Sequence, residues 1–418
     1  MPRLWLKVLE GKGEPLRRKM FWERLGFVAP PAGAADARIL IDANGHGEYG
    51  QVHTFLRQFR ERYPAWTVIL VSWNPEIVEL AGRNPSIDHV VFMPWDVGWI
   101  ARRFFRALAP KVYVTVDQLR MPAVLRAAKA LGVRTMLVSA SFPDVYVESE
   151  AMKRASAFQF HRDLDRICVA DEEARASFRR IGCDADRLRL TGYMKYDLEH
   201  LRTTEEDRRA LRRSLGVEDG EPIWVAGSVR PGEVHAVVDA YARARRSIPN
   251  LRFLLAPRYV PDADGACQAA ADHGLAWVRR TALTPGGAAA GDAVIVLDTY
   301  GELSRLYAIA DVVFVGNSLV PADRYALGQN LAEPLVHGMP VVFGPHMNKW
   351  RAVTSLLKDA WPGVEAADSS ELATSVVKLL QNTELRTRVQ QRVAEVVARN
   401  RGAVERNFAA LVELIEPS

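Results

Sequence analysis

The stretch from Gly316 to His346 reads GNSLVPADRYALGQNLAEPLVHGMPVVFGPH, and a strand-like run, DVVFV at Asp311 to Val315, comes directly before it. The pattern predicts a buried strand, a long polar loop, a helix that opens near Asn330 and a second strand over Pro340 to Phe343. A helix that begins at Asn330 would present unpaired N–H groups to a phosphate, and Glu333, one turn later, would accept hydrogen bonds from a ribose diol. The same residues also fit an ordinary capped helix, with Asn330 as the N-cap and Glu333 at the third helical position.

Strands and helices alternate along the rest of the chain in the same way. The strand-like runs lie at 39–41, 68–72, 90–93, 112–116, 135–138 and 166–170, and then at 223–226, 253–256, 276–278, 294–297, 312–315 and 341–343. Near-continuous apolar strands separated by helices are typical of a parallel sheet that is covered on both faces. The sequence therefore predicts an α/β protein with two Rossmann-like doubly wound domains that face each other across a cleft.

A highly charged segment, Arg202 to Arg213, separates the two series. We expect a basic N-terminal segment and linker over 1–36, a first Rossmann-like domain over 37–215, a second Rossmann-like domain over 216–390, and a last helix over 391–418 that packs back on the protein.

The composition disfavours several classes of function. The 418 residues include 55 Lys and Arg against 50 Asp and Glu, which is a mixed surface and does not support a nucleic-acid partner. The apolar runs have the length of strands and are too short to span a membrane. Three widely spaced cysteines form neither a disulfide framework nor a zinc pattern, and the N-terminus has no signal-peptide pattern, so we expect a cytoplasmic protein.

A basic amphipathic piece lies near the N-terminus, from Arg17 to Phe27, and it carries Phe21, Trp22 and Leu25. Such a helix can lie on an anionic membrane surface, which would make the protein peripheral at the inner membrane. It can equally pack against its own domain.

Doubly wound sheets bind ligands outside the carboxyl ends of their strands, so the loops that follow the strands are the places to search. Glu48 follows Gly45-His46-Gly47 where a strand turns into a helix. A carboxylate there can act as a general base for an acceptor hydroxyl, or it can simply stabilise the start of the helix. His46 fits a base, a hydrogen-bond donor or an ordinary loop residue.

In the second series, Arg258 follows Ala256-Pro257, and Ser228 and Gly232 precede a helix. A guanidinium and backbone N–H groups at one sheet edge suit a phosphate, although an arginine that ends a strand is often only a solvated charge. No dinucleotide fingerprint, P-loop, metal-ligand cluster or nucleophile elbow appears at a suitable position. Hydride transfer, ATP hydrolysis and serine hydrolysis are therefore disfavoured, and we expect neither a metal nor a cofactor.

Taken together, these motifs resemble those of the Kdo transferases, which move 3-deoxy-D-manno-octulosonic acid (Kdo) from its CMP-activated form to a lipid A precursor. The matching pieces occur in the family's order: GHGE at 45–48, PWD at 94–96, TGYMKYD at 191–197, GSVRPGE at 227–233, APR at 256–258, DTYGEL at 298–303, VGNSLV at 315–320, NLAEP at 330–334 and GPH at 344–346. The resemblance implies a two-domain GT-B glycosyltransferase fold and an inverting, metal-independent transfer. It also implies a CMP-sugar donor and a lipid or glycan acceptor, with the acceptor bound by the domain over 37–215 and the donor nucleotide by the domain over 216–390.

Carried over by position, Glu48 corresponds to the family's catalytic base, and His46 and Asp117 are candidates for catalytic support. The residues that correspond to the donor site are Ser228, Arg258, Gly301, Glu302, Asn330 and Glu333.

The chain also departs from the family pattern. The segment E-T-E-L-W-P-N becomes DQLRMPA at 117–123, so that Leu119 replaces the second acid, and N-A-R-L-S becomes SASFP at 139–143. In the donor half, R-H reads Arg258-Tyr259 and G-H-N reads Gly328-Gln329-Asn330. These changes point to an altered acceptor. They also keep two alternatives open: a degenerate transferase that serves as a binding or scaffold protein, and a GT-B enzyme that uses another nucleotide sugar.

Overall fold

The computed structural model describes residues 13–31, 37–117, 121–142, 161–197, 203–283, 292–321 and 327–416. The chain divides into two compact units. The first consists of Met1–Asp197 together with Arg401–Ser418, and the second of Leu198–Asn400. The boundaries expected at residues 215 and 390 differ from this division, because α10 (Glu205–Ser214) lies in the second unit and α17 (Thr383–Asn400) continues ten residues past 390.

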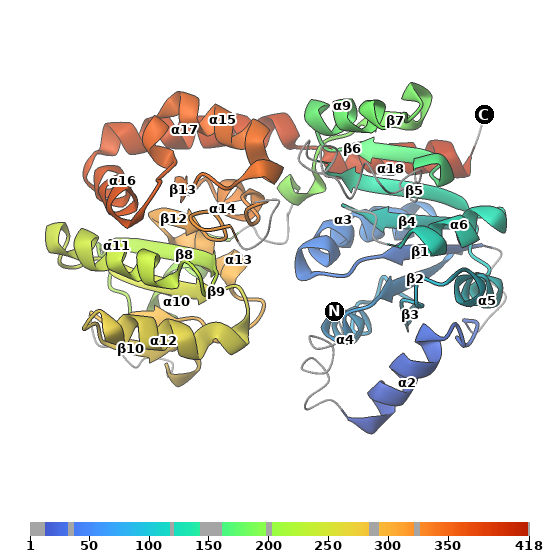
Figure 1. Cartoon of the computed structure of the whole chain (residues 1–418), viewed down its shortest axis with the longest axis horizontal. Helices are drawn as coiled ribbons and strands as arrows, with labels where there is room; N and C mark the ends of the chain where they lie inside the picture. Colours follow the sequence, from blue (N-terminus) through green and yellow to red (C-terminus); the bar gives the residue numbers. More distant parts are fainter. Residues whose placement is uncertain are drawn as a thin grey trace. The chain divides into compact units, whose positions relative to one another are not determined.

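The first unit is built on a parallel sheet of seven strands in the order β3-β2-β1-β4-β5-β6-β7 (Figure 1). The strands are β1 (Arg38–Asp42), β2 (Thr67–Ser72), β3 (His89–Phe92), β4 (Val112–Val116), β5 (Arg134–Ala140), β6 (Arg166–Val169) and β7 (Leu188–Leu190). The helices are α2 (Glu14–Arg24), α3 (His46–Arg62), α4 (Pro75–Ala81), α5 (Gly98–Leu108), α6 (Pro122–Ala130), α9 (Glu172–Arg180) and α18 (Ala403–Ile415).

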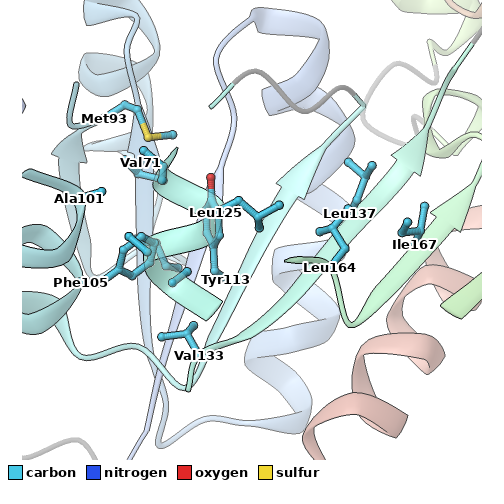
Figure 2. Packing of buried hydrophobic residues seen from close by; sticks show 14 of the residues in the cluster. Val71, Met93, Ala101, Phe105, Tyr113, Leu125, Val133, Leu137, Leu164 and Ile167 are labelled. Atoms are coloured by element: carbon cyan, nitrogen blue, oxygen red, sulfur yellow. The ribbon is translucent and has the colours of Figure 1, made fainter. Parts of the chain in front are cut away.

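Successive strand residues point to opposite faces of this sheet, so each face has its own core. Leu40 packs with residues of α5, α6 and α9, whereas Ile39 and Ile41 pack with residues of α3 and α18. Figure 2 shows the first core, where Phe105 and Tyr113 lie among aliphatic side chains from several strands. Both faces are thus covered by helices, as the apolar strands predict.

The last helix, α18, belongs to the first unit although the second unit precedes it in the chain. The carboxylate of Asp197 accepts hydrogen bonds from the N–H groups of Gly402 and Val404, at 2.9 and 2.7 Å, and so holds the start of α18. Leu411 of this helix is fully buried in the second core of the unit. The C-terminal helix α18 is thus part of the core of the first unit.

The second unit contains a parallel sheet of six strands in the order β10-β11-β9-β8-β12-β13 (Figure 1). The strands are β8 (Ile223–Val229), β9 (Arg252–Pro257), β10 (Trp277–Arg279), β11 (Val294–Val296), β12 (Val312–Val315) and β13 (Val341–Phe343). Besides α10 and α17, the helices are α11 (Val234–Ser247), α12 (Ala263–Asp272), α13 (Leu303–Leu306), α14 (Ala332–Val336), α15 (Arg351–Ala360) and α16 (Ser369–Gln381).

Aromatic packing joins the sheet of the second unit to α11. The ring of Tyr241 in α11 stacks on that of Phe253 in β9, with the centroids 4.4 Å apart, and Trp224 of β8 packs against both. The Tyr241 hydroxyl donates to the carbonyl oxygen of Leu251 at 3.1 Å, which satisfies its polar end inside the core.

Each sheet has one place where the strand order reverses. In the first unit β1 lies beside β4, and in the second β8 lies beside β12. The connections leave in opposite directions at such a point, and the carboxyl ends of the two strands open a crevice in which ligands bind. The motifs GHGE at 45–48 and GSVRPGE at 227–233, which the sequence singles out, lie at the carboxyl ends of β1 and β8 at these two positions.

Two local details differ from the expectations. The short strand β7 was not predicted, because Leu-Arg-Leu has no apolar run and only Leu188 is buried. The helix expected to open at Asn330 begins at Ala332, with Leu331 as its N-cap, and it is only five residues long. Residues 322–326 of the loop before it and residues 284–291 lie outside the described residues.

Candidate active site and nucleotide site

In the first unit, the carboxylate of Glu48 is held by the loop that connects β1 to α3. The backbone N–H of Asn44 donates to Glu48 Oε2 at 2.7 Å. Asn44 is itself fixed, because its Oδ1 accepts from the N–H of Trp73 at 2.9 Å and its Nδ2 donates to Asp42. The backbone that aims Glu48 is thus tied to β1 and to the end of β2.

Asp42, at the end of β1, extends this hydrogen-bond network to the neighbouring strand β4. Its Oδ2 accepts hydrogen bonds from the hydroxyls of Tyr113 at 3.0 Å and Thr115 at 3.3 Å, both on β4. Burial, and then the nearby Asp42 carboxylate, raise the pKa of the Tyr113 phenol well above its ordinary value, so Tyr113 stays a proton donor. The chain of contacts from β4 through Asp42 and Asn44 makes Glu48 a preorganised carboxylate.

Asp117, directly after β4, meets a buried lysine. Lys195 Nζ lies 3.2 Å from Asp117 Oδ2 and donates to the Tyr193 hydroxyl at 2.6 Å, and Tyr193 in turn donates to Asp117 at 3.2 Å. Burial raises the pKa of Tyr193 well above its ordinary value, and the carboxylates of Asp117 and Glu48 act in the same direction. A β-carbon on Gly47 would lie 3.8 Å from Lys195 Cε, so the lysine lies against the first turn of α3, which carries Glu48.

The structure therefore brings Glu48 and Asp117 together around Lys195, a residue that was not selected from the sequence. The sequence could have indicated this residue, because Tyr193 and Lys195 both belong to the motif TGYMKYD. The third candidate, His46, lies with Nε2 4.0 Å from Glu76 Oε2 of α4, and its side chain is about half exposed. Leu119 lies outside the described residues.

Four residues other than glycine have positive φ angles at or directly after the carboxyl ends of strands. They are Asp117 (66°) after β4, Ser139 (54°) in β5, Ser228 (59°) in β8 and Asn317 (55°) after β12. Such left-handed backbone is unfavourable for most L-residues and gathers at functional sites. The Ser139 hydroxyl has two hydrogen-bond partners, because it donates to the side chain of Gln51 at 2.7 Å and accepts from the N–H of Met194 at 3.0 Å.

In the second unit, the buried carboxylate of Glu233 organises the crevice between β8 and β12. It accepts hydrogen bonds from the N–H groups of Arg230 at 3.0 Å, Ser318 at 3.2 Å and Leu319 at 3.1 Å, and from that of Asn317. Burial raises its pKa above the ordinary value of 4.5, and the four N–H donors act against that rise. Glu233 ends the motif GSVRPGE but was not selected as a site residue.

The main chains approach very closely at this edge. A β-carbon on Gly227 would lie 1.9 Å from the Tyr307 hydroxyl, one on Gly316 would lie 2.6 Å from the carbonyl oxygen of Ser228, and one on Gly344 would lie 2.2 Å from that of Ser318. Only glycine fits at these three positions, which keeps the ends of β8, β12 and β13 within one compact edge.

Glu333 and Asn330 lie side by side at this edge. Asn330 Nδ2 donates to Glu333 Oε1 at 2.8 Å, and the Ser304 hydroxyl donates to Glu333 Oε2. Asn330 Oδ1 accepts from the N–H of Ala332 at 3.1 Å, so the asparagine still supports the start of α14. His337 Nε2 lies 2.8 Å from the Ser304 carbonyl oxygen.

The pKa of the Tyr307 phenol is influenced by the charges of both Glu333 and Arg258. Burial raises the pKa of its phenol, the Glu333 carboxylate acts in the same direction, and the Arg258 guanidinium acts against it. Glu302 follows Gly301, whose φ is 84°, and it binds the Arg280 guanidinium at 3.2 Å and the Thr299 hydroxyl. Among the expected donor residues of this unit, Ser228 lies at the end of β8 and Glu333 in the first turn of α14, and the others lie in loops or turns: Arg258, Gly301, Glu302 and Asn330.

Among the residues that the structure describes, no group of three or more His, Cys, Asp or Glu side chains is arranged to hold a metal ion. In the same described part of the chain, no helix combines the length and the apolar composition that crossing a bilayer requires.

Comparison with known proteins agrees with the motifs. Residues 19–198 match the family model described as 3-deoxy-D-manno-octulosonic-acid transferase (kdotransferase). A 3-deoxy-D-manno-octulosonic acid transferase from Haemophilus influenzae is 26% identical over 408 residues, which are 96% of this chain and 92% of that protein.

Two solved structures share the architecture. A putative UDP-N-acetylglucosamine 2-epimerase from Listeria monocytogenes has a TM-score of 0.65 at 12% identity, covering 91% of this chain and 97% of its own. Alr3699/HepE from Anabaena, in complex with UDP and glucose, has a TM-score of 0.63 at 15% identity, covering 91% and 99%. The expectation of a GT-B fold with two parallel-sheet α/β domains is confirmed.

Proposed function

The chain belongs to the Kdo transferase family, and from that premise we propose that it moves a CMP-activated acidic sugar, Kdo or a related ulosonic acid, to a hydroxyl of a lipid A precursor or another glycan. Family membership makes it a glycosyltransferase. The sugar, the acceptor and the roles of individual residues are the proposal. The observation that carries it is the fixed carboxylate of Glu48 at the β1/β4 reversal point, held by Asn44 at 2.7 Å.

In this mechanism Glu48 is the general base. It takes the proton of the acceptor hydroxyl while that oxygen forms a bond to the anomeric carbon of the donor. The bond from the anomeric carbon to the phosphate oxygen breaks, and CMP leaves with the electron pair. Attack from the side opposite the leaving group inverts the anomeric carbon, and no covalent enzyme intermediate is formed.

In the second unit, Ser228, Arg258, Gly301, Glu302, Asn330 and Glu333 would hold the donor. Arg258 supplies a positive charge for the phosphate, and the carboxylate of Glu333 accepts hydrogen bonds from the ribose diol. We infer a metal-independent reaction because the charge on the leaving phosphate can be met by a guanidinium and by backbone N–H groups at the sheet edge.

The experiment that tests this function compares Glu48→Gln with the unchanged protein. Glutamine keeps the size of the side chain but cannot take a proton, so we expect transfer from CMP-Kdo to fall by about 10²- to 10⁴-fold. CMP affinity, measured by titration calorimetry, should stay within about twofold, because Glu48 lies in the other unit. Glu61→Gln, at an exposed carboxylate near the end of the same helix α3, serves as the matched control. A Glu48→Gln protein with normal activity would contradict the role of the base.

A nucleotide panel separates the remaining alternatives. We expect CMP to bind more tightly than UMP, UDP or GDP. Tighter binding of UDP would indicate another nucleotide sugar, and binding of none of them would indicate a scaffold protein.

We also propose that the first unit contacts a membrane surface through an aromatic and basic cluster at α2 and α5. Trp22, Phe27 and Trp99 are 46%, 50% and 57% exposed. The Arg103 guanidinium lies 4.2 Å from the Phe27 ring centroid and 5.3 Å from that of Trp99. Exposed tryptophan and phenylalanine beside cations are typical of helices that lie in the headgroup region of a bilayer.

The same helix also packs on its own unit, because Met20 is buried and the Glu23 carboxylate accepts from the N–H of Phe92 at 2.8 Å. The two interpretations of Arg17 to Phe27 are therefore compatible. One face of α2 is attached to the sheet edge, and the other carries the aromatic residues.

A further inference from the structure

Two arginines from different loops of the second unit stack on one exposed tyrosine. The guanidinium carbons of Arg230 and Arg258 each lie 5.1 Å from the centroid of the Tyr259 ring, and Tyr259 is 41% exposed. Arg230 follows β8, and Arg258 follows β9, which pairs with β8. The two positive charges are thus gathered at the carboxyl edge of the sheet, beside the β8/β12 reversal point.

Neither guanidinium takes part in an ion pair with another described residue, although other arginines of this unit do, for example Arg280 with Glu302 at 3.2 Å. Arg230 Nε is also buried with no hydrogen-bond partner within the described part of the chain. Like charges repel, and a buried donor without a partner costs free energy. Both features are expected where an anionic ligand completes the site.

The main chain holds both arginines in place. The Glu233 carboxylate accepts from the N–H of Arg230 at 3.0 Å, and the N–H of Arg258 donates to the Val229 carbonyl oxygen at 2.8 Å. The four hydrogen bonds that Glu233 accepts within the described part of the chain all come from backbone N–H groups, so this carboxylate fixes the loop and does not neutralise a guanidinium. The pair of charges is therefore built into the edge rather than carried on a flexible segment.

A CMP-activated ulosonic acid matches this arrangement chemically. Its anomeric carbon carries two anionic groups, the phosphodiester and the carboxylate, so the two negative charges lie only a few bonds apart. A nucleotide ester of a neutral sugar has no such carboxylate. Two guanidiniums on one ring can meet both charges at once, each with parallel N–H groups that match a carboxylate or a phosphate.

We propose that Arg230 is a specificity-determining donor residue that binds the sugar carboxylate, while Arg258 binds the phosphate and Tyr259 positions both guanidiniums. This inference rests on the proposed function and deepens it, because it explains how the site selects an acidic sugar. Arg230 was not among the donor residues expected from the sequence.

The test compares the affinities for CMP and for freshly prepared CMP-Kdo by titration calorimetry. Arg230→Gln should leave CMP affinity within about threefold and weaken CMP-Kdo at least tenfold, because only the ester has the carboxylate. Arg230→Lys should recover part of the loss, since it keeps the charge but not the planar fork. Arg258→Gln should weaken both ligands. Tyr259→Phe should bind like the unchanged protein. Tyr259→Ala should weaken both ligands, and CMP-Kdo more than CMP, because both guanidiniums lose the ring on which they stack.

Arg246→Gln, on the exposed end of α11, is the matched control and should change neither affinity. Equal effects of Arg230→Gln on the two ligands, or no effect on either, would overturn the role of Arg230 while leaving the transferase proposal intact. Loss of CMP binding in the unchanged protein would instead contradict the proposed function itself. Thermal unfolding of each variant shows whether a loss of affinity comes from loss of the fold.

Discussion

The ammonium group of Lys195 lies 3.2 Å from Asp117 Oδ2, and both side chains are buried, with exposed fractions of 9% and 6%. A buried ion pair contributes little net stability, but the removal of one partner leaves a buried charge without compensation. Lys195 also lies against Gly47, the residue before Glu48 in the first turn of α3.

We therefore expect Asp117→Asn and Lys195→Met each to lower the free energy of unfolding of the first unit by about 3–5 kcal/mol. The double variant should be more stable than either single variant, because neither charge is then left alone. Urea unfolding of the four proteins measures this coupling. If the two single effects simply add, the contact does not act as an ion pair.

The Glu233 carboxylate suggests a second prediction. Its two oxygens accept from four backbone N–H groups, and the amide of Glu233→Gln would turn an N–H₂ group toward some of them. We expect a loss of about 1–3 kcal/mol in the free energy of unfolding, together with weaker CMP binding, because the loop that carries Ser228 and Arg230 is no longer fixed. Calorimetry and urea unfolding measure the two effects.

Glu371→Gln is a control for this change, because Glu371 also accepts a backbone N–H, that of Ala367 at 2.8 Å, but is exposed. Unchanged CMP affinity in Glu233→Gln would show that the loop keeps its form without the carboxylate.

His337 makes the stability of the second unit depend on pH. Burial lowers the pKa of its imidazole below the ordinary value of 6.5, so the unfolded chain takes up a proton at a higher pH than the folded protein does. Between these two pKa values the unfolded state binds more protons, and the free energy of unfolding therefore rises with pH. The contribution of His337 should be fully present above about pH 7.5 and should be lost as the pH falls through the folded pKa.

His337→Gln removes this titration but keeps a donor for the Ser304 carbonyl oxygen. Urea unfolding at pH 5, 6, 7 and 8 should give a smaller slope for the variant than for the unchanged protein. The same slope in both proteins would assign the pH dependence to other groups.

Most strands could be predicted because they are short apolar runs between helices. The bounds of β4 agree with the expected run at 112–116 to the residue, and β12 and β13 begin one residue after the runs that start at Asp311 and Pro340. The sheet edge that carries the candidate sites also follows from the sequence, since loops after parallel strands meet there. The motifs in these loops therefore predicted Glu48, Arg258 and Glu333 as candidate site residues.

Contacts between distant loops could not be predicted in the same way. Lys195 and Asp117 are 78 residues apart, and their meeting depends on the conformation of two irregular segments. Arg230 and Tyr259 belong to different βα loops, and the sequence pattern does not predict the direction in which their side chains point. The burial of Glu233 likewise follows from close main-chain packing at Gly316, which a single sequence does not display.

The aromatic and basic cluster at α2 and α5 leads to the last prediction. We expect the protein to float with vesicles of mixed anionic and zwitterionic lipids, and to float less as salt is raised, because cations near the surface attract anionic headgroups. Replacing Trp22, Phe27 and Trp99 by alanine together should abolish flotation while leaving CMP affinity unchanged, since these residues lie in the first unit and the proposed donor site lies in the second. Replacement of Trp277 by alanine, at a similarly exposed tryptophan of the second unit, is the matched control and should leave flotation intact. Equal flotation of the triple variant and the unchanged protein would place the membrane contact elsewhere in the chain.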